Sequence, residues 1–137
     1  AQTSATEVAN YLDTSALVKL VVAEPDSPAL LQWLTETERE PVSSDLARTE
    51  LMRAVRRVAP DRALQAREVL SRLTLTRVRT EVFERAGQMD PALLRSLDAI
   101  HLASALDLGD DLEAVVTYDE RLADACGAHG VPTVGPS

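Results

Sequence analysis

Short apolar runs alternate with longer amphipathic segments along this chain, and that alternation constrains its fold more than any other feature. A short apolar run is typical of a buried strand, whereas apolar residues three or four apart are typical of a helix packed on a core. Strands separated by helices are joined by right-handed crossovers and form a parallel sheet. The sequence therefore predicts an α/β fold of three layers, α/β/α, with a central parallel sheet of four to five strands.

The boundaries of these segments follow from periodicity and from turn residues. Strands are predicted at 8–12, 41–44, 75–79, 114–118 and 131–134. Helices are predicted at 14–23, from the turn at 24–28 to about 38, and at 45–58, 60–73, 81–89, 97–108 and 119–127. Thr80 is expected to cap the helix that follows it, and Gly109 to end the helix before it.

The length of 137 residues suits one domain, because domains commonly hold about 100–150 residues. We interpret residues 1–10 as a leader or the start of the first strand, partly non-native, and residues 11–137 as a single domain. No apolar stretch approaches the ~20 residues of a membrane span, and Cys126 is the only cysteine, so a cytoplasmic protein is expected.

The net charge of −8 argues, by itself, against a protein that binds nucleic acid. A cluster of acids that binds divalent cations would lower the formal charge without repelling phosphates once it is loaded. Lys19 is the only lysine among the 14 basic residues, and arginine is the side chain best suited to grip phosphate with two hydrogen bonds. The net charge of the chain therefore does not exclude a nucleic-acid substrate.

Four acids stand where such a fold would carry them inward: Asp13, Glu50, Asp98 and Asp119. Asp13 and Asp119 each follow a predicted strand, and ligands of parallel sheets bind at the carboxyl ends of the strands. Asp98 begins a buried helix, and Glu50 lies at the rim of an apolar helix stripe, which gives it the weakest case. Each acid has a structural alternative: a helix cap, a first-turn acid, or for Glu50 a surface partner of Arg53.

Carboxylates held close together repel one another unless a cation neutralises them. Oxygen ligands without nearby Cys or His favour Mg²⁺, or Mn²⁺, over zinc. Thr117 is a further catalytic candidate, because its hydroxyl could bond a carboxylate two residues before Asp119. His101 is expected to be a packed histidine with a satisfied ring nitrogen, and Arg95 and Arg121 are candidates for pairing with the acids or with phosphate.

Four segments carry a resemblance to a known family: Leu-Asp-Thr-Ser-Ala-Leu-Val-Lys-Leu at 12–20, Ala-Arg-Thr-Glu-Leu at 47–51, Leu-Asp-Ala-Ile-His-Leu-Ala-Ser-Ala at 97–105, and Val-Thr-Tyr-Asp at 116–119. In this order they resemble the PIN-domain nucleases, and in particular the VapC toxins of type II toxin–antitoxin (VapBC) systems. The resemblance covers nearly all of the chain from Tyr11 onward.

The resemblance implies an Mg²⁺-dependent endoribonuclease whose metal ligands match Asp13, Glu50, Asp98 and Asp119. It also implies a cognate VapB-type antitoxin, a single-stranded or structured RNA substrate, and a homodimer. Two helices between about 26 and 58 are expected to form an apolar groove for an antitoxin helix. Ions held by the acids would activate water for in-line attack on a phosphodiester, leaving 5′-phosphate and 3′-hydroxyl ends.

Other functions remain as alternatives. A phosphohydrolase of the haloacid-dehalogenase type also begins with a strand-end aspartate, but it needs a second acid two residues later, where this chain has Ser15. A phosphoacceptor receiver domain is excluded, because it needs a lysine late in the chain and the only lysine is Lys19. A catalytically weak PIN-like module that only binds protein is the alternative from a different functional class.

Overall fold

The computed structural model describes residues 8–36 and 39–137 and contains one parallel sheet of five strands. The strands are β1 (Ala9–Leu12), β2 (Glu40–Ser44), β3 (Thr74–Thr76), β4 (Leu112–Val116) and β5 (Thr133–Val134). Their order across the sheet is β3-β2-β1-β4-β5, and every neighbouring pair is parallel. The predicted parallel sheet is therefore confirmed.

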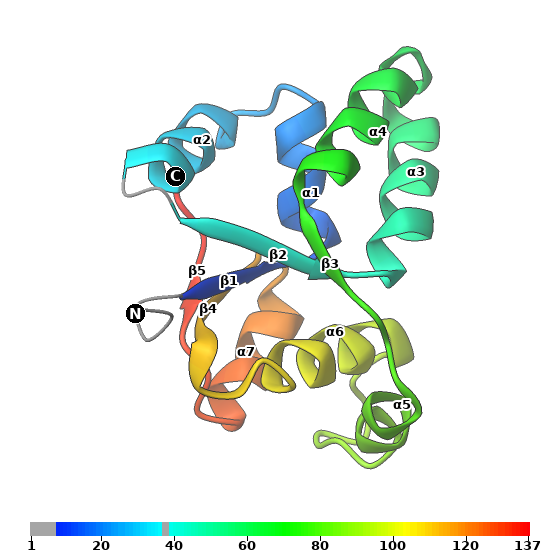
Figure 1. The fold of residues 1–137 in the computed structure, drawn as a ribbon, viewed down its shortest axis with the longest axis vertical. Coiled ribbons are helices and arrows are strands. Elements are labelled where there is room, and N and C mark those ends of the chain that lie inside the picture. The colour runs from blue at the N-terminus through cyan, green and yellow to red at the C-terminus, as the bar shows by residue number, and fades with distance from the viewer. Residues whose placement is uncertain (1–7, 37–38) are drawn as a thin grey trace, which may run out of the picture.

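Helices cover both faces of the sheet, as Figure 1 shows. The α-helices are α1 (Thr14–Val21), α2 (Ser27–Glu36), α3 (Leu46–Val58), α4 (Ala63–Arg72), α5 (Thr80–Gly87), α6 (Ser96–Leu106) and α7 (Glu120–Ala128). Two 3₁₀ turns, η2 (Pro60–Arg62) and η3 (Gly109–Asp111), precede α4 and β4. Helices α1 to α4 lie on one face and α5 to α7 on the other, which confirms the three layers.

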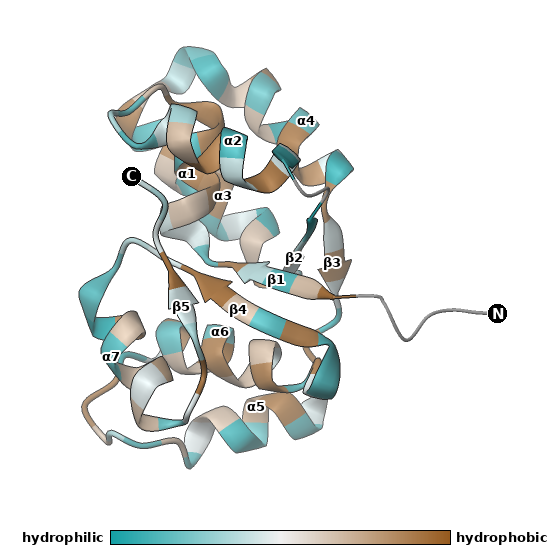
Figure 2. Cartoon of the chain, turned by 90° about the vertical axis from the view of Figure 1, so that its left-hand side faces the viewer, coloured by the Kyte–Doolittle hydropathy of each residue, from teal (hydrophilic) through white to brown (hydrophobic). Residues whose placement is uncertain are grey.

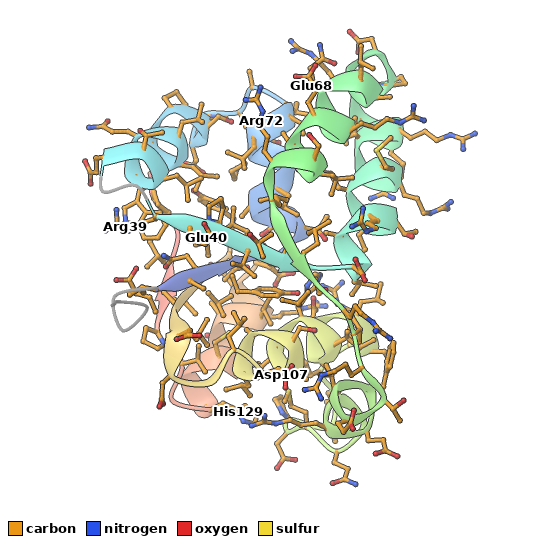
Figure 3. The ribbon with its side chains drawn as sticks, in the orientation of Figure 1. Arg39, Glu40, Glu68, Arg72, Asp107 and His129 are labelled. Atoms are coloured by element: carbon orange, nitrogen blue, oxygen red, sulfur yellow. The ribbon has the colours of Figure 1, made fainter. Side chains whose placement is uncertain are left out.

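The strand order reverses between β1 and β4. From β1 the chain builds outward to β2 and β3, and then crosses back to place β4 and β5 on the other side of β1. The loops after β1 and β4 consequently leave the sheet toward opposite faces and open a crevice, which is where ligands bind in open parallel sheets. In Figure 3, Arg39 and Glu40 mark the amino-terminal end of β2, so this crevice lies at the opposite end of the strands.

The sheet separates two apolar cores because successive strand residues point to opposite faces. Leu12 and Val116 pack against helices α1, α3 and α4, whereas Tyr11 and Val115 pack against α6 and α7. Figure 2 shows the strands between two layers of helices that carry both hydrophilic and hydrophobic residues. The central strand β1 is therefore buried on both faces, as is typical of a parallel sheet, whereas the edge strands β3 and β5 are partly exposed.

Several predicted boundaries were wrong. The fourth strand spans Leu112–Val116 instead of 114–118, and the fifth spans Thr133–Val134 instead of 131–134. The third strand ends at Thr76 instead of Arg79, because its partner β2 ends at Ser44, where the pairing of Ser44 with Thr76 is the last. Thr80 is the first residue of α5 and makes no capping bond; the N-cap is Arg79, whose carbonyl accepts the first helical hydrogen bonds. The sixth helix ends at Leu106, and Gly109, with φ of 61°, begins η3 instead of ending the helix.

Asn10 lies inside β1 and is fully buried, with its side-chain amide donating to Glu113 at 2.9 Å. Residues 9 and 10 are thus the start of the first strand, one of the two interpretations of the segment 1–10, and residues 1–7 lie outside the described residues. In the described parts of the chain, no helix has both the length and the apolarity to cross a membrane.

The expected groove between the helices of residues 26–58 stays a prediction. The apolar residues of α2, Leu30 and Leu34, and those of α3, Leu51 and Val55, are buried in one core with α1, which packs against both helices. Leu31 of α2 and Val58 of α3 are exposed, at 52% and 61%.

Candidate active site

Asp13 lies between the carboxyl end of β1 and the first turn of α1. Its backbone N–H donates to the Val116 carbonyl of β4 at 3.2 Å, which fixes it at the point where the strand order reverses. Its Oδ1 accepts the N–H of Ala16 at 3.0 Å, so the carboxylate is also the N-cap of α1. The strand-end placement and the capping alternative are both correct, because one side chain fills both roles.

Two hydroxyl groups complete the surroundings of Asp13. Ser15 donates to Oδ1 at 2.7 Å, and Thr117 donates to Oδ2 at 2.6 Å, as predicted for a threonine that bonds a carboxylate. Asp13 is only 4% exposed. Burial raises the pKa of Asp13, and the hydrogen bonds from Thr117, Ser15 and the Ala16 N–H offset only part of that rise. The carboxylate is therefore rigidly oriented and costly to keep ionised.

Glu50, on α3, reaches the same turn of α1 from the neighbouring helix. Thr14 donates to its Oε1 at 2.6 Å, and His101 Nε2 lies 2.5 Å from the same oxygen. Burial by itself raises the pKa of Glu50, but the hydrogen bond and charge of His101, with the bond from Thr14, outweigh it and leave the pKa lowered. Glu50, the acid with the weakest support from the sequence, therefore bonds Thr14, the residue that directly follows Asp13.

His101 is buried, with both ring nitrogens in contact with a partner. Nε2 faces Glu50, and Nδ1 lies 2.7 Å from the hydroxyl of Tyr11, which in turn donates to Ser44 at 3.0 Å. The expected packed histidine is confirmed, and its contacts link α6 to α3, β1 and β2. His101 thus acts on the site through Glu50, as a positioning residue.

Asp98 and Asp119 share one arginine. Arg95 Nη2 lies 3.0 Å from Asp98 Oδ2 and 3.1 Å from Asp119 Oδ2, and Arg95 Nε also donates to Asp98 Oδ2 at 3.1 Å. Asp98 is on the first turn of α6 with a side chain 14% exposed, in agreement with its predicted inward face. The bond and charge of Asp98, with the charge of Asp119, raise the pKa of Arg95.

Asp119 is the N-cap of α7, and its two oxygens have separate partners. Oδ1 accepts the backbone N–H groups of Arg121 and Leu122 at 2.8 and 3.3 Å, while Oδ2 contacts Arg95. Thr117 connects this acid to Asp13, because its hydroxyl accepts the N–H of Asp119 at 3.0 Å and donates to Asp13. Asp13 and Asp119 are therefore joined through one side chain.

The chemistry of the four acids fits a hard divalent cation, because all the side-chain donors are carboxylate oxygens. Among residues 8–36 and 39–137, however, no three Asp, Glu, His or Cys side chains are grouped closely enough to hold an ion in this arrangement. The guanidinium of Arg95 stands in for a cation between Asp98 and Asp119. The four acids therefore fit a metal site in donor type, and two of them are bonded to an arginine in this arrangement.

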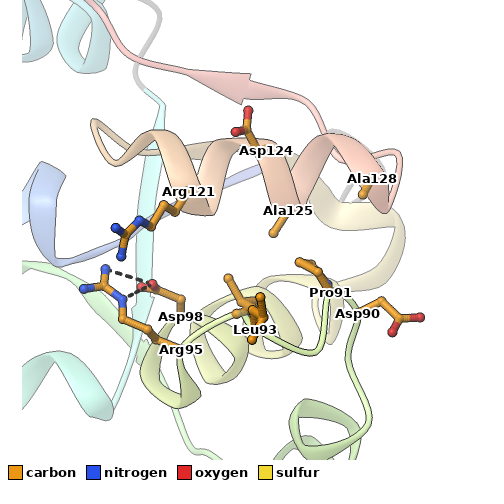
Figure 4. Close-up of a pocket in the computed structure, with 10 residues that line it drawn as sticks. Asp90, Pro91, Leu93, Arg95, Asp98, Arg121, Asp124, Ala125 and Ala128 are labelled. Atoms are coloured by element: carbon orange, nitrogen blue, oxygen red, sulfur yellow. Dashed lines mark hydrogen bonds and ion pairs between the residues drawn. The ribbon is translucent and has the colours of Figure 1, made fainter.

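A pocket of about 620 Å³ opens beside these acids, between the segment before α6 and helix α7. Figure 4 shows Arg95 and Arg121 directed toward each other at one end of it, with Asp98 between their helices. Apolar side chains also line this pocket, among them Leu94, Ala125 and Leu93, the last of which is 96% exposed. A smaller pocket of about 440 Å³ is lined by Arg95, Asp119, Glu120 and Arg121.

Sequence reasoning gave no role to Thr14, to Ser15 as a donor, or to Tyr11. Thr14 and Ser15 stand inside the quoted Leu-Asp-Thr-Ser segment, and hydroxyl residues directly after a strand-end acid are the signal that could have identified them. Tyr11 gave no such signal, because its hydroxyl meets His101 only through the packing of α6 on β1. The predicted pairing of Arg95 with the acids is confirmed.

Comparison with known proteins gives consistent results. A family model described as PIN domain matches residues 11–128. Ribonuclease VapC46 of Mycobacterium tuberculosis (strain ATCC 25618 / H37Rv) is 46% identical over 127 residues, which cover 93% of this chain and 97% of that protein. Ribonuclease VapC47 of the same species (strain CDC 1551 / Oshkosh) is 42% identical over 130 residues, covering 92% and 96%.

Solved structures agree at the level of the fold. The crystal structure of Mycobacterium tuberculosis VapC20, described as a sarcin-ricin loop cleaving toxin, superposes with a TM-score of 0.73 at 17% identity, over 93% of this chain and 100% of that one. VapBC2 of Rickettsia felis, bound to a DNA fragment from its promoter, gives 0.68 at 16% identity, over 95% and 100%. The sequence match and the fold lead to one conclusion: the chain belongs to the PIN-domain family and, within it, to the VapC ribonucleases.

Proposed function

We propose that this protein is the toxin of a toxin–antitoxin pair and hydrolyses RNA phosphodiester bonds as an Mg²⁺-dependent endoribonuclease. The observation that carries the proposal is the gathering of Asp13, Glu50, Asp98 and Asp119, from the sheet and both helical layers, around the point where the strand order reverses. The identity to VapC ribonucleases supports the same reaction.

Asp13, Glu50, Asp98 and Asp119 are the residues that would hold the metal, which is Mg²⁺ or alternatively Mn²⁺. A divalent cation held by these carboxylates supplies water activation at neutral pH and stabilisation of the negative charge on the leaving 3′ oxygen. The protein's own part is orientation. Ser15 and Thr117 fix both oxygens of Asp13, and Thr14 and His101 fix Glu50 in its ionised form.

Arg121 lines both pockets beside the acids and makes no ion pair with any described residue, so its guanidinium is available to an RNA phosphate. The apolar side chains that line the larger pocket, Leu93 and Leu94, would accept a neighbouring base or ribose. The expected products carry 5′-phosphate and 3′-hydroxyl ends.

We further propose a VapB-type antitoxin as cognate partner, in line with a structural neighbour described as VapBC2. A homodimer and a cytoplasmic location complete the proposal. The alternatives are less favoured. Ser15, which occupies the place of the second acid in a haloacid-dehalogenase site, donates to Asp13 instead, and no observation favours a module that only binds protein.

The decisive measurement is cleavage of single-stranded RNA with Mg²⁺ or Mn²⁺ by the wild type and by Asp13→Asn. Asn keeps the shape of the cap but removes the charge, so the rate should fall by more than the roughly 10–100-fold lost when an outer hydrogen-bond partner of a metal ligand is removed. The surface variant Asp61→Asn is the matched control. Equal rates for Asp13→Asn and wild type, or no cleavage with either metal, would refute the proposal.

A further inference from the structure

One nitrogen atom of Arg95 contacts two of the acids. We propose that Arg95 is a built-in counter-ion of the site: it neutralises Asp98 and Asp119 when no metal is bound, and a divalent cation must displace it to bind them. This inference rests on the proposed function, because it assigns a regulatory role to a residue of the same site. The metal affinity of the protein then depends on Arg95 as well as on the acids.

The geometry places Arg95 where a cation would be. Its Nη2 lies within 3.1 Å of an oxygen of each acid, while its Nε makes a second bond to Asp98. Asp119 Oδ1 is engaged by two N–H groups at the start of α7, so the oxygen that Arg95 contacts, Oδ2, is the one left for an ion. Arginine and metal therefore compete for the same atoms.

The charges favour a cation at this position. Two carboxylates near one point repel each other unless a positive charge lies between them. The guanidinium, with one positive charge and several donors, removes that repulsion when no metal is bound. A divalent cation carries twice the charge, so it can replace the arginine once the acids are reached.

The side chain of Arg95 also has space to move away from the two acids. Its side chain is 59% exposed, and it lines both the pocket of about 620 Å³ and that of about 440 Å³. Figure 4 shows its guanidinium at the edge of the larger pocket, facing Arg121. Rotation of the side chain into this space requires no change in helix α6, whose N-cap is Arg95 itself.

The test is the affinity for Mn²⁺ of the full chain without RNA, measured by titration calorimetry or by the electron paramagnetic resonance signal of free Mn²⁺. Arg95→Gln should bind Mn²⁺ about tenfold more tightly than the wild type, because the competitor is removed. Arg95→Lys should fall between the two, since an ammonium is a point charge without the planar fork of arginine. Circular dichroism confirms that each variant is folded.

Arg121→Gln is the matched control, because it removes one positive charge from the same pocket, and the Arg121 side chain makes no ion pair with an acid among the described residues. Its Mn²⁺ affinity should change less than about twofold. An unchanged or weaker affinity in Arg95→Gln would overturn the inference, and so would an equal gain in Arg121→Gln, which would indicate a general charge effect. Wild-type protein that binds Mn²⁺ and cleaves RNA while Arg95→Gln gains nothing would leave the proposed function intact. Absence of Mn²⁺ binding in all variants would overturn both.

Discussion

Asp13 has to meet two requirements that conflict energetically. As a cap of α1 it stabilises the fold, but as a buried carboxylate it is costly to ionise, and the net effect raises its pKa. Three hydrogen bonds hold it in place all the same. A buried carboxylate that is oriented by hydrogen bonds but not neutralised by a positive charge is typical of a site that binds a cation.

At the level of this residue, Asp13→Asn should stabilise the metal-free protein while it removes activity. Because the folded pKa lies above the unfolded value of 3.8, stability is lost as pH rises from about 3.8 through the folded pKa, so the buried carboxyl costs stability at pH 7. Asparagine lacks this cost and is an equally good N-cap. The free energy of unfolding at pH 7 with EDTA should rise by about 0.5–2 kcal/mol.

Chemical denaturation at pH 7 and again below pH 3.8 measures this difference. The gain should shrink at the lower pH, where the wild-type carboxyl is protonated in both states. Asp61→Asn, on the exposed turn η2, should show no comparable gain at either pH. A variant less stable than the wild type at pH 7 would contradict the prediction.

At the level of the elements, two of the acids are held at the N-termini of helices. Asp13 caps α1 and Asp119 caps α7, so both carboxylates are fixed by the backbone N–H groups of the helix that follows. Asp98 lies one turn before His101 on α6, and that helix therefore brings an acid to one side of the site and the partner of Glu50 to the other.

Two glycines give a matched test of backbone conformation in these elements. Gly127 lies within α7, whereas Gly109 has a φ of 61°, and a Cβ added at either position would meet no atom within 4 Å. Gly127→Ala should stabilise the protein by about 0.5–1 kcal/mol, because alanine loses less conformational freedom in a helix. Gly109→Ala should destabilise it by about 1–2 kcal/mol, because a left-handed conformation is strained for any residue with a Cβ.

Thermal or urea unfolding of both variants checks the pair. Since neither position has neighbours to clash with, opposite signs can only come from the backbone. Destabilisation by Gly127→Ala would contradict a helical backbone at that residue, and no effect of Gly109→Ala would contradict a left-handed one.

At the level of the whole molecule, the site joins three layers. Asp13 comes from the sheet, Glu50 from the α1–α4 layer, and Asp98 and Asp119 from the α5–α7 layer. An ion that contacts acids from several layers binds only the folded chain, and so it should raise the stability of the whole domain.

Melting in EDTA and in Mg²⁺ tests this linkage. At a Mg²⁺ concentration about 100 times the dissociation constant the gain should be about 2.7 kcal/mol, which corresponds to several degrees in Tm. Asp13→Asn should lose most of the shift, and Asp61→Asn should keep it. A Tm that is the same in EDTA and in Mg²⁺ for the wild type would argue against an ion that links the layers.

The order of elements, the parallel sheet and the strand-end acids were predictable from the sequence, because periodicity and strand termini are local properties of the chain. Strand length was less predictable: the third strand stops at Thr76 because its partner β2 stops, which is a property of a pair. The same holds for the start of α5, where backbone geometry placed the cap at Arg79 and the identity of Thr80 did not decide it.

The sequence by itself determined which side chains are available and which lie at strand ends: Asp13, Asp119 and their neighbouring hydroxyls. Only the tertiary structure decided which side chains contact one another. Thr14 and Glu50 are 36 positions apart, Glu50 and His101 are 51 apart, and Arg95 reaches Asp119 across 24. Such contacts depend on how helices pack on the two faces of the sheet, and packing is set by the shape of the whole core, which no local pattern encodes.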